Sequence, residues 1–153
     1  MMSRLPTASA LLSLLVMVGC GGHDFEPPDR GERVREAEAA FSPAVFDSVS
    51  WASDSLRAFS GNTVYAEKCG RCHGPLGRGN TDYARGRGLE VPSLVEPESA
   101  LTSVDTLRHV IFVGHEEGMP IFGAGGITPR EIDGVAYYIL NVLRPDAVET
   151  SGF

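Results

Sequence analysis

The fold of this chain depends on the stretch Cys69-Gly70-Arg71-Cys72-His73, near the middle of its 153 residues. Residues three apart lie on one side of a helical turn, so this spacing places two thiols together, with an imidazole next to them. A redox-active cysteine pair would follow a strand, whereas the flanks here have the pattern of a helix and then a glycine loop. A structural disulfide would close too small a ring to restrain the unfolded chain much. A zinc site would need two further ligands, and His109 and His115 lie too far along the chain for the usual spacing.

This spacing is the C-x-x-C-H signature of covalent haem attachment. Each thiol can add across one of the two vinyl groups of a haem, and the next residue then places its imidazole under the iron. We therefore expect one covalently bound haem c at Cys69 and Cys72, with His73 as an axial ligand of the iron.

The second axial ligand is expected to be Met119. It is the only methionine that remains once the N-terminal leader, with Met1, Met2 and Met17, has been removed. Glycine and proline flank Met119, which is typical of a fixed loop and not of a helix interior, where methionine fills a core. His115 and His109 are the alternatives, and either would give an iron bound by two histidines.

The N-terminus has the pattern of an export signal, which we assign to residues 1–19. A single Arg4 precedes an apolar run of about eleven residues, too short to span a bilayer, which needs roughly 20. The segment Met17-Val18-Gly19-Cys20 resembles a bacterial lipoprotein box, in which the cysteine becomes the lipidated N-terminus. The alternative is an ordinary cleaved signal with a stray cysteine. We expect a protein anchored by lipid on Cys20 to a bacterial membrane, on the periplasmic or external side.

Composition narrows the class of protein and of partner. A chain that is 42% hydrophobic and 22% charged is globular, and 18 glycines and 10 prolines predict many loops. The net charge is −7 and becomes more negative when Arg4 leaves with the leader. Nucleic acid is therefore not an expected partner, and docking onto a basic protein surface is expected instead.

Several segments, in their order along the chain, resemble the class I c-type cytochromes of the bacterial monohaem kind. Steps of four residues relate Gly61, Tyr65 and Cys69, as in the first helix of that family. The other matching segments are a haem-site run at 69–79, a proline loop at 91–94, a methionine loop at 119–122 and a closing helix within 127–139. The resemblance covers roughly residues 59–145, which we assign to a cytochrome c domain.

The resemblance implies an all-α protein with the small class I cytochrome c fold, in which three to four short helices and long loops surround one covalently bound haem. It implies that the carbonyl of Pro92 accepts a hydrogen bond from the outer nitrogen of His73. It also implies that the first and last helices cross with Gly61 against Tyr137 or Tyr138.

Local patterns predict two of these helices independently. Thr128 is suited to cap a helix, because proline follows it and Glu131 stands three residues after the cap. Apolar residues then recur at helical spacing as far as Val142. Residues 106–113 are expected to form a shorter helix.

Residues 20–58 differ in composition from the rest and are expected to form a lipid-anchored linker. Two adjacent prolines, a charged run and several serines indicate a tether and not a second domain. Apolar residues at helical spacing nevertheless follow one another here: Val45, Val49, Ala52, Leu56 and Phe59. We expect a short amphipathic helix that packs on the cytochrome domain or on a partner. Residues 146–153 are assigned to a C-terminal tail.

An iron with two axial ligands has no open position for a substrate, so an electron carrier is expected and not an enzyme. The expected setting is a respiratory or photosynthetic chain, with redox proteins of a membrane complex as partners. One alternative is a haem subunit of a catalytic complex. Another is a five-coordinate haem enzyme or sensor, in which His115 would be the acid–base residue.

Overall fold

In a computed structural model of the chain, the structure describes residues 27–96 and 101–145. The expected leader 1–19, Cys20 and the tail 146–153 lie outside these residues. Every regular element in the described ranges is helical, which confirms the all-α prediction. None of the helices found there has both the length and the apolar character that crossing a membrane requires.

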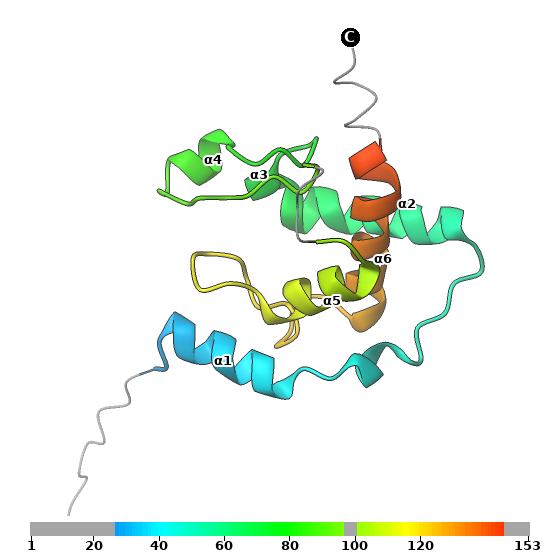
Figure 1. The fold of residues 1–153 in the computed structure, drawn as a ribbon, viewed down its shortest axis with the longest axis horizontal. Helices are drawn as coiled ribbons and strands as arrows, with labels where there is room; N and C mark the ends of the chain where they lie inside the picture. The colour runs from blue at the N-terminus through cyan, green and yellow to red at the C-terminus, as the bar shows by residue number, and fades with distance from the viewer. Residues whose placement is uncertain (1–26, 97–100, 146–153) are drawn as a thin grey trace, which may run out of the picture.

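The helices follow one another along the chain as Figure 1 shows. The N-terminal part holds α1 (Arg30–Ala40) and a 3-10 turn (Pro43–Phe46). Next comes α2 (Asp54–Val64), which continues through a π-helical turn (Tyr65–Cys69) into α3 (Gly70–His73). The remaining elements are α4 (Asp82–Arg85), α5 (Val104–Val113), α6 (Pro129–Tyr138) and a π-helical turn (Ile139–Leu143) that extends α6.

α2 and α6 cross at close range (Figure 1). Gly61 of α2 lies against the backbone of Gly134 and against Tyr138, and a Cβ atom built on Gly61 would stand 2.7 Å from the Cβ of Tyr138. The expected contact with Tyr138 is confirmed, and Gly134 is a second small residue at the crossing. The ring of Tyr138 also packs against Tyr65, with 5.6 Å between centroids. Because α2 continues directly to Cys69, this crossing positions the attachment turn.

Side-chain caps determine where α5 and α6 begin. The backbone N–H of Thr128 donates to the Glu131 carboxylate at 2.6 Å, and that of Glu131 donates to Thr128 Oγ1 at 3.3 Å, so the expected capping box is confirmed. α5 begins two residues before the predicted start at 106, because Ser103 accepts a hydrogen bond from the backbone of Thr106 at 3.0 Å. The two helices contribute buried apolar residues to one core: Leu107, Ile111, Ile132, Val135 and Ala136.

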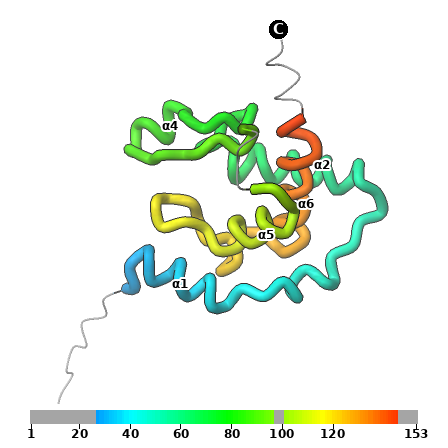
Figure 2. Tube along the Cα trace, in the orientation of Figure 1, coloured from blue at the N-terminus to red at the C-terminus, as the bar shows by residue number. Residues whose placement is uncertain are grey.

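The segment that precedes α2 passes along the outside of α5 and α6 before it turns into α2 (Figure 2). The helix expected from Val45 to Phe59 is wrong in its bounds, because the 3-10 turn ends at residue 46 and helix resumes only at residue 54. Val45 and Val49 pack against the core, whereas Leu56 and Phe59 are exposed on α2. The apolar residues at helical spacing therefore do not belong to one helix, because they are divided between the segment around the 3-10 turn and α2.

A buried carboxylate fastens this segment to the helices. Asp133 of α6 is fully buried and accepts hydrogen bonds from Trp51 Nε1 at 2.6 Å, from Arg57 at 2.6 and 2.8 Å, and from Arg108 Nε at 2.9 Å. Burial alone would raise the pKa of Asp133, but the hydrogen bonds from the two arginines and the indole outweigh burial and lower it. The charged carboxylate thus joins the N-terminal segment to α2, α5 and α6.

Candidate functional site

Cys69, Cys72 and His73 lie together on one helical turn. This turn is the end of the continuous helix that α2 and α3 form through the π-helical turn between them. The helix stops at Gly74, whose φ of +79° is a conformation that residues with a side chain rarely adopt. Both cysteines are free and half-buried. The expected attachment residues are therefore grouped at one helix end and are not joined as a disulfide.

Burial controls the protonation of this turn. Burial raises the pKa of Cys69 to about 12, and the neighbouring Cys72 adds to the rise, so the thiol stays protonated at neutral pH. Burial lowers the pKa of His73, which favours the neutral imidazole. A neutral imidazole has a lone pair for a metal ion, whereas a protonated one has none.

The loop after the turn folds back and brings Pro92 to His73. The backbone N–H of Gly79 donates to the carbonyl of His73 at 2.8 Å. A Cβ atom on Gly79 would stand 2.3 Å from the carbonyl oxygen of Val91, so the two arms of the loop are in backbone contact. The Pro92 carbonyl interacts with the imidazole and partly offsets the lowering of its pKa.

His73 is nevertheless not fully satisfied by the chain. Its Nδ1 is buried, and among the described residues no atom meets both the distance and the angle of a hydrogen bond to it. A buried polar atom without a partner is uncommon, which makes this imidazole a candidate for binding a further group. Two free thiols and a neutral imidazole on one turn are the donor set that a covalently bound haem requires. The residues present therefore fit this cofactor.

Two hydroxyl groups hold the turn in place. The buried hydroxyl of Tyr65 donates to the carbonyl of Gly74 at 2.7 Å, and burial raises the pKa of Tyr65, which keeps this donor protonated. Thr81 Oγ1 lies 3.0 Å from the carbonyl oxygen of Arg71 and 3.2 Å from that of Cys72. Thr81 was not among the expected site residues, although threonine is a preferred helix N-cap residue and Thr81 caps α4.

Met119 lies on a separate loop between α5 and α6. The loop closes on itself, because the N–H of His115 donates to the carbonyl of Met119 at 3.1 Å. Gly114 and Gly118 have φ values of +74° and +136°, which permit the sharp reversal. Met119 is half-buried and packs against the same apolar core as Cys69.

A cavity of about 520 Å³ lies between the methionine loop and the loop that carries Pro92. Residues from both loops line it: Asn80, Leu89, Glu90, Val91, Pro92 and Glu117. At its edge the loops come into contact, since a Cβ atom on Gly118 would stand 2.7 Å from a methyl group of Leu89. Glu117, two residues before Met119, is thus the lining residue from the loop between α5 and α6, and Met119 itself is not among the residues that line the cavity.

The alternative histidine ligands have other surroundings. His109 Nε2 lies 2.9 and 3.0 Å from the carboxylate oxygens of Glu38, and the ring of Phe41 packs edge-on against the imidazole. His115 is 58% exposed, and its Nδ1 accepts a hydrogen bond from the backbone of Glu117 at 3.3 Å. In the described ranges, no three or more His, Cys, Asp or Glu side chains form a group that could hold a metal ion.

Comparison with known proteins identifies one sequence family. The family described as "Cytochrome C oxidase, cbb3-type, subunit III" matches residues 56–139, which is more than half of the chain. The match contains the attachment turn, Pro92 and Met119, and it begins after α1 and Trp51. No curated protein and no solved structure gives a significant match.

Proposed function

The chain belongs to the family of cbb3-type cytochrome c oxidase subunit III, and on this basis we propose that it transfers electrons through one covalently attached haem c. The observation that carries the proposal is the turn at residues 69–73, where two free thiols adjoin a half-buried imidazole whose neutral form is favoured by burial. A bound haem supplies an iron that alternates between the ferric and ferrous states, so it accepts and gives up one electron.

Each residue of the turn has its own part in holding the cofactor. Cys69 and Cys72 would hold a haem through thioether bonds formed by adding each S–H group across one vinyl C=C bond, with no atom lost. His73 would bind the haem iron in its neutral form, which its burial favours. The carbonyl of Pro92 orients the imidazole, as partners of a metal-bound histidine do. Thr81 and Tyr65 fix the backbone on which these groups stand.

We assign Met119 as the second axial ligand. Glu117 of its loop lines the same cavity as Pro92, and the Met119 side chain packs on the same core as Cys69. His109, by contrast, is engaged by Glu38. With two axial ligands the iron has no open position for a substrate, so the protein is an electron carrier and not an enzyme by itself. Methionine ligation also raises the reduction potential.

The proposed setting is outside the cytoplasm, at a bacterial membrane. The leader pattern at residues 1–19 and the lipoprotein box ending at Cys20 support it. The family supports a redox partner in a respiratory complex. The acidic net charge supports a partner with a basic docking surface.

Spectroscopy of the purified protein tests this assignment. The ferric protein should show the methionine-to-iron charge-transfer band in the near infrared, and the ferrous protein should not bind carbon monoxide. Met119→Ala should lose the band and bind carbon monoxide, whereas His115→Ala should keep the wild-type behaviour. If the magnetic spectrum of the wild-type protein is that of an iron bound by two histidines, the second ligand is His115 or His109 and not Met119. A wild-type spectrum with an open iron position would favour a haem enzyme or sensor.

A further inference from the structure

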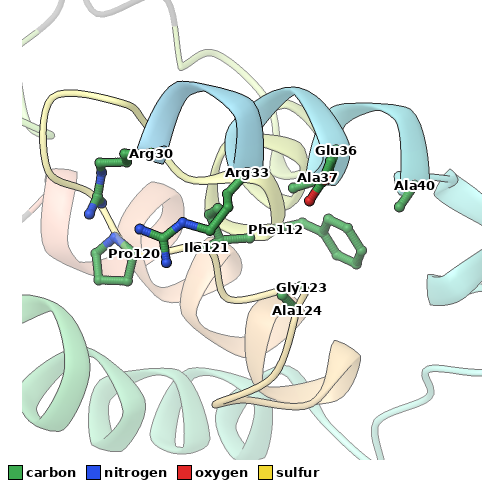
Figure 3. Close-up of a pocket in the computed structure, with 10 residues that line it drawn as sticks. All are labelled: Arg30, Arg33, Glu36, Ala37, Ala40, Phe112, Pro120, Ile121, Gly123 and Ala124. Carbon is green, nitrogen blue, oxygen red and sulfur yellow. The ribbon is translucent and has the colours of Figure 1, made fainter. Parts of the chain in front are cut away.

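Arg30 connects α1 to the loop that carries Met119. It is the first residue of α1, and it lies outside the part of the chain that the family match covers. Its Nη2 donates to the carbonyl of Met119 at 2.6 Å, and its Nε donates to the carbonyl of His115 at 3.1 Å. Figure 3 shows the Arg30 side chain extending from α1 toward Pro120, the residue after Met119.

The two carbonyls belong to the first and last residues of a tight turn. Within the turn, the N–H of His115 donates to Met119 at 3.1 Å, and the N–H of Gly118 donates to His115 at 3.2 Å. The glycines at 114 and 118 give this loop more backbone freedom than other residues would. A planar guanidinium that bridges both ends therefore adds a constraint that the loop sequence does not supply.

α1 can hold Arg30 in place because the other end of the helix is fixed independently. Glu38 pairs with His109 of α5 at 2.9 Å, and Ala37 is buried. The ring of Phe41, which follows the helix, packs edge-on against His109 and Phe112. None of these contacts involves the methionine loop, so they anchor the helix on α5 while Arg30 reaches over a groove to the loop.

We propose that Arg30 is a positioning residue for the second axial ligand. The N-terminal segment thereby completes the ligand loop of the cytochrome domain from outside the family-matched region. This proposal rests on the assignment of Met119 as ligand. Arg30 acts through the Met119 backbone, so its loss leaves the haem attached and increases the fraction of time for which Met119 is off the iron.

Binding of free imidazole to the ferric protein measures that fraction, because imidazole reaches the iron only when Met119 is absent. The apparent dissociation constant for imidazole is inversely proportional to the fraction of molecules in which Met119 is off the iron. Hydrogen bonds from a charged donor are among the stronger ones in proteins, so Arg30→Ala should tighten imidazole binding by about tenfold or more. Arg33→Ala, one turn further along the same face and lining the same groove, should leave it unchanged.

The outcomes separate this proposal from the assignment on which it rests. A wild-type near-infrared band with equal imidazole affinity in wild type and Arg30→Ala would overturn the role of Arg30 alone. Equal tightening in Arg30→Ala and Arg33→Ala would also overturn it, since the effect would then be a general loosening of α1. A wild-type spectrum without the methionine band would overturn Met119 ligation itself. If Arg30→Ala fails to fold, Arg30→Lys carries the test, because an ammonium lacks the rigid planar fork of donors that reaches both carbonyls, and intermediate tightening is expected.

Discussion

A Cβ atom built on Gly61 would stand 2.1 Å from the carbonyl oxygen of Gly134. The backbones of α2 and α6 thus meet directly, and no side chain fits between them. α2 continues through Tyr65 to the attachment turn. The distance between α2 and α6 at their crossing therefore determines where Cys69 and His73 lie relative to the core. A change at Gly61 should therefore affect both stability and the cofactor site.

Gly61→Ala should destabilise the holoprotein by about 3 kcal/mol, because the added methyl group meets a rigid backbone and not a flexible side chain. Asn62→Ala, at the adjacent exposed position of the same helix, should be neutral or slightly stabilising. Urea unfolding followed by helical circular dichroism compares the two variants with wild type. Equal stability of wild type and Gly61→Ala would show that the helices are not in backbone contact.

Asp133→Asn should cost about 3 kcal/mol of unfolding free energy, since it removes the shared partner of Arg57 and Arg108 in a fully buried position. Asp105→Asn is the matched control, because Asp105 also pairs with Arg108 but is 84% exposed, and it should have almost no effect. If the two variants lose stability equally, the buried carboxylate is not the group that holds the N-terminal segment.

The same carboxylate predicts a pH dependence. The pKa of Asp133 is lower in the folded protein than its usual value, so its stabilising effect is present above that usual value and is lost as the pH falls through the lowered folded pKa. Wild type should lose stability in this acidic range more steeply than Asp133→Asn does. Parallel stability profiles of the two proteins below pH 4 would contradict the assignment.

Cys20→Ser should release the protein from membranes or block its processing, while haem attachment and iron ligation remain intact. Bacterial lipoproteins carry several acyl chains, whereas one chain alone gives only marginal anchoring. Fractionation with and without detergent measures the release, and mass spectrometry of the mature N-terminus identifies the modification. An unmodified terminus at any residue other than 20 would contradict the lipid anchor and leave the cytochrome assignment untouched.

Part of this architecture could be predicted from the sequence, because local chemistry determines it. The capping box at Thr128 depends on residues three apart. The attachment turn is likewise a local motif. The family resemblance implied a contact of Gly61 with Tyr137 or Tyr138, and the structure shows Tyr138. The capping box and the attachment turn need no knowledge of how distant segments meet, whereas the contact between α2 and α6 joins two distant segments and was expected from the resemblance alone.

The contacts of the N-terminal segment could not be predicted in this way. Trp51 meets Asp133 across 82 positions, and Arg30 meets Met119 across 89. A single polar pair at that separation leaves no periodic pattern in the sequence. The apolar spacing from Val45 onward indicated one helix, because periodicity does not reveal where the chain leaves a 3-10 turn and enters a new helix.

Covalent haem retention tests the central claim most directly, because every ligand assignment depends on attachment at Cys69 and Cys72. The purified protein should be denatured and extracted with acidified acetone. The haem that remains in the protein pellet should then be measured from the absorbance of its pyridine haemochrome. Wild type should keep one haem per chain in the pellet, and Cys69→Ala with Cys72→Ala should lose it to the solvent. Free extraction of haem from the wild-type protein would contradict the account.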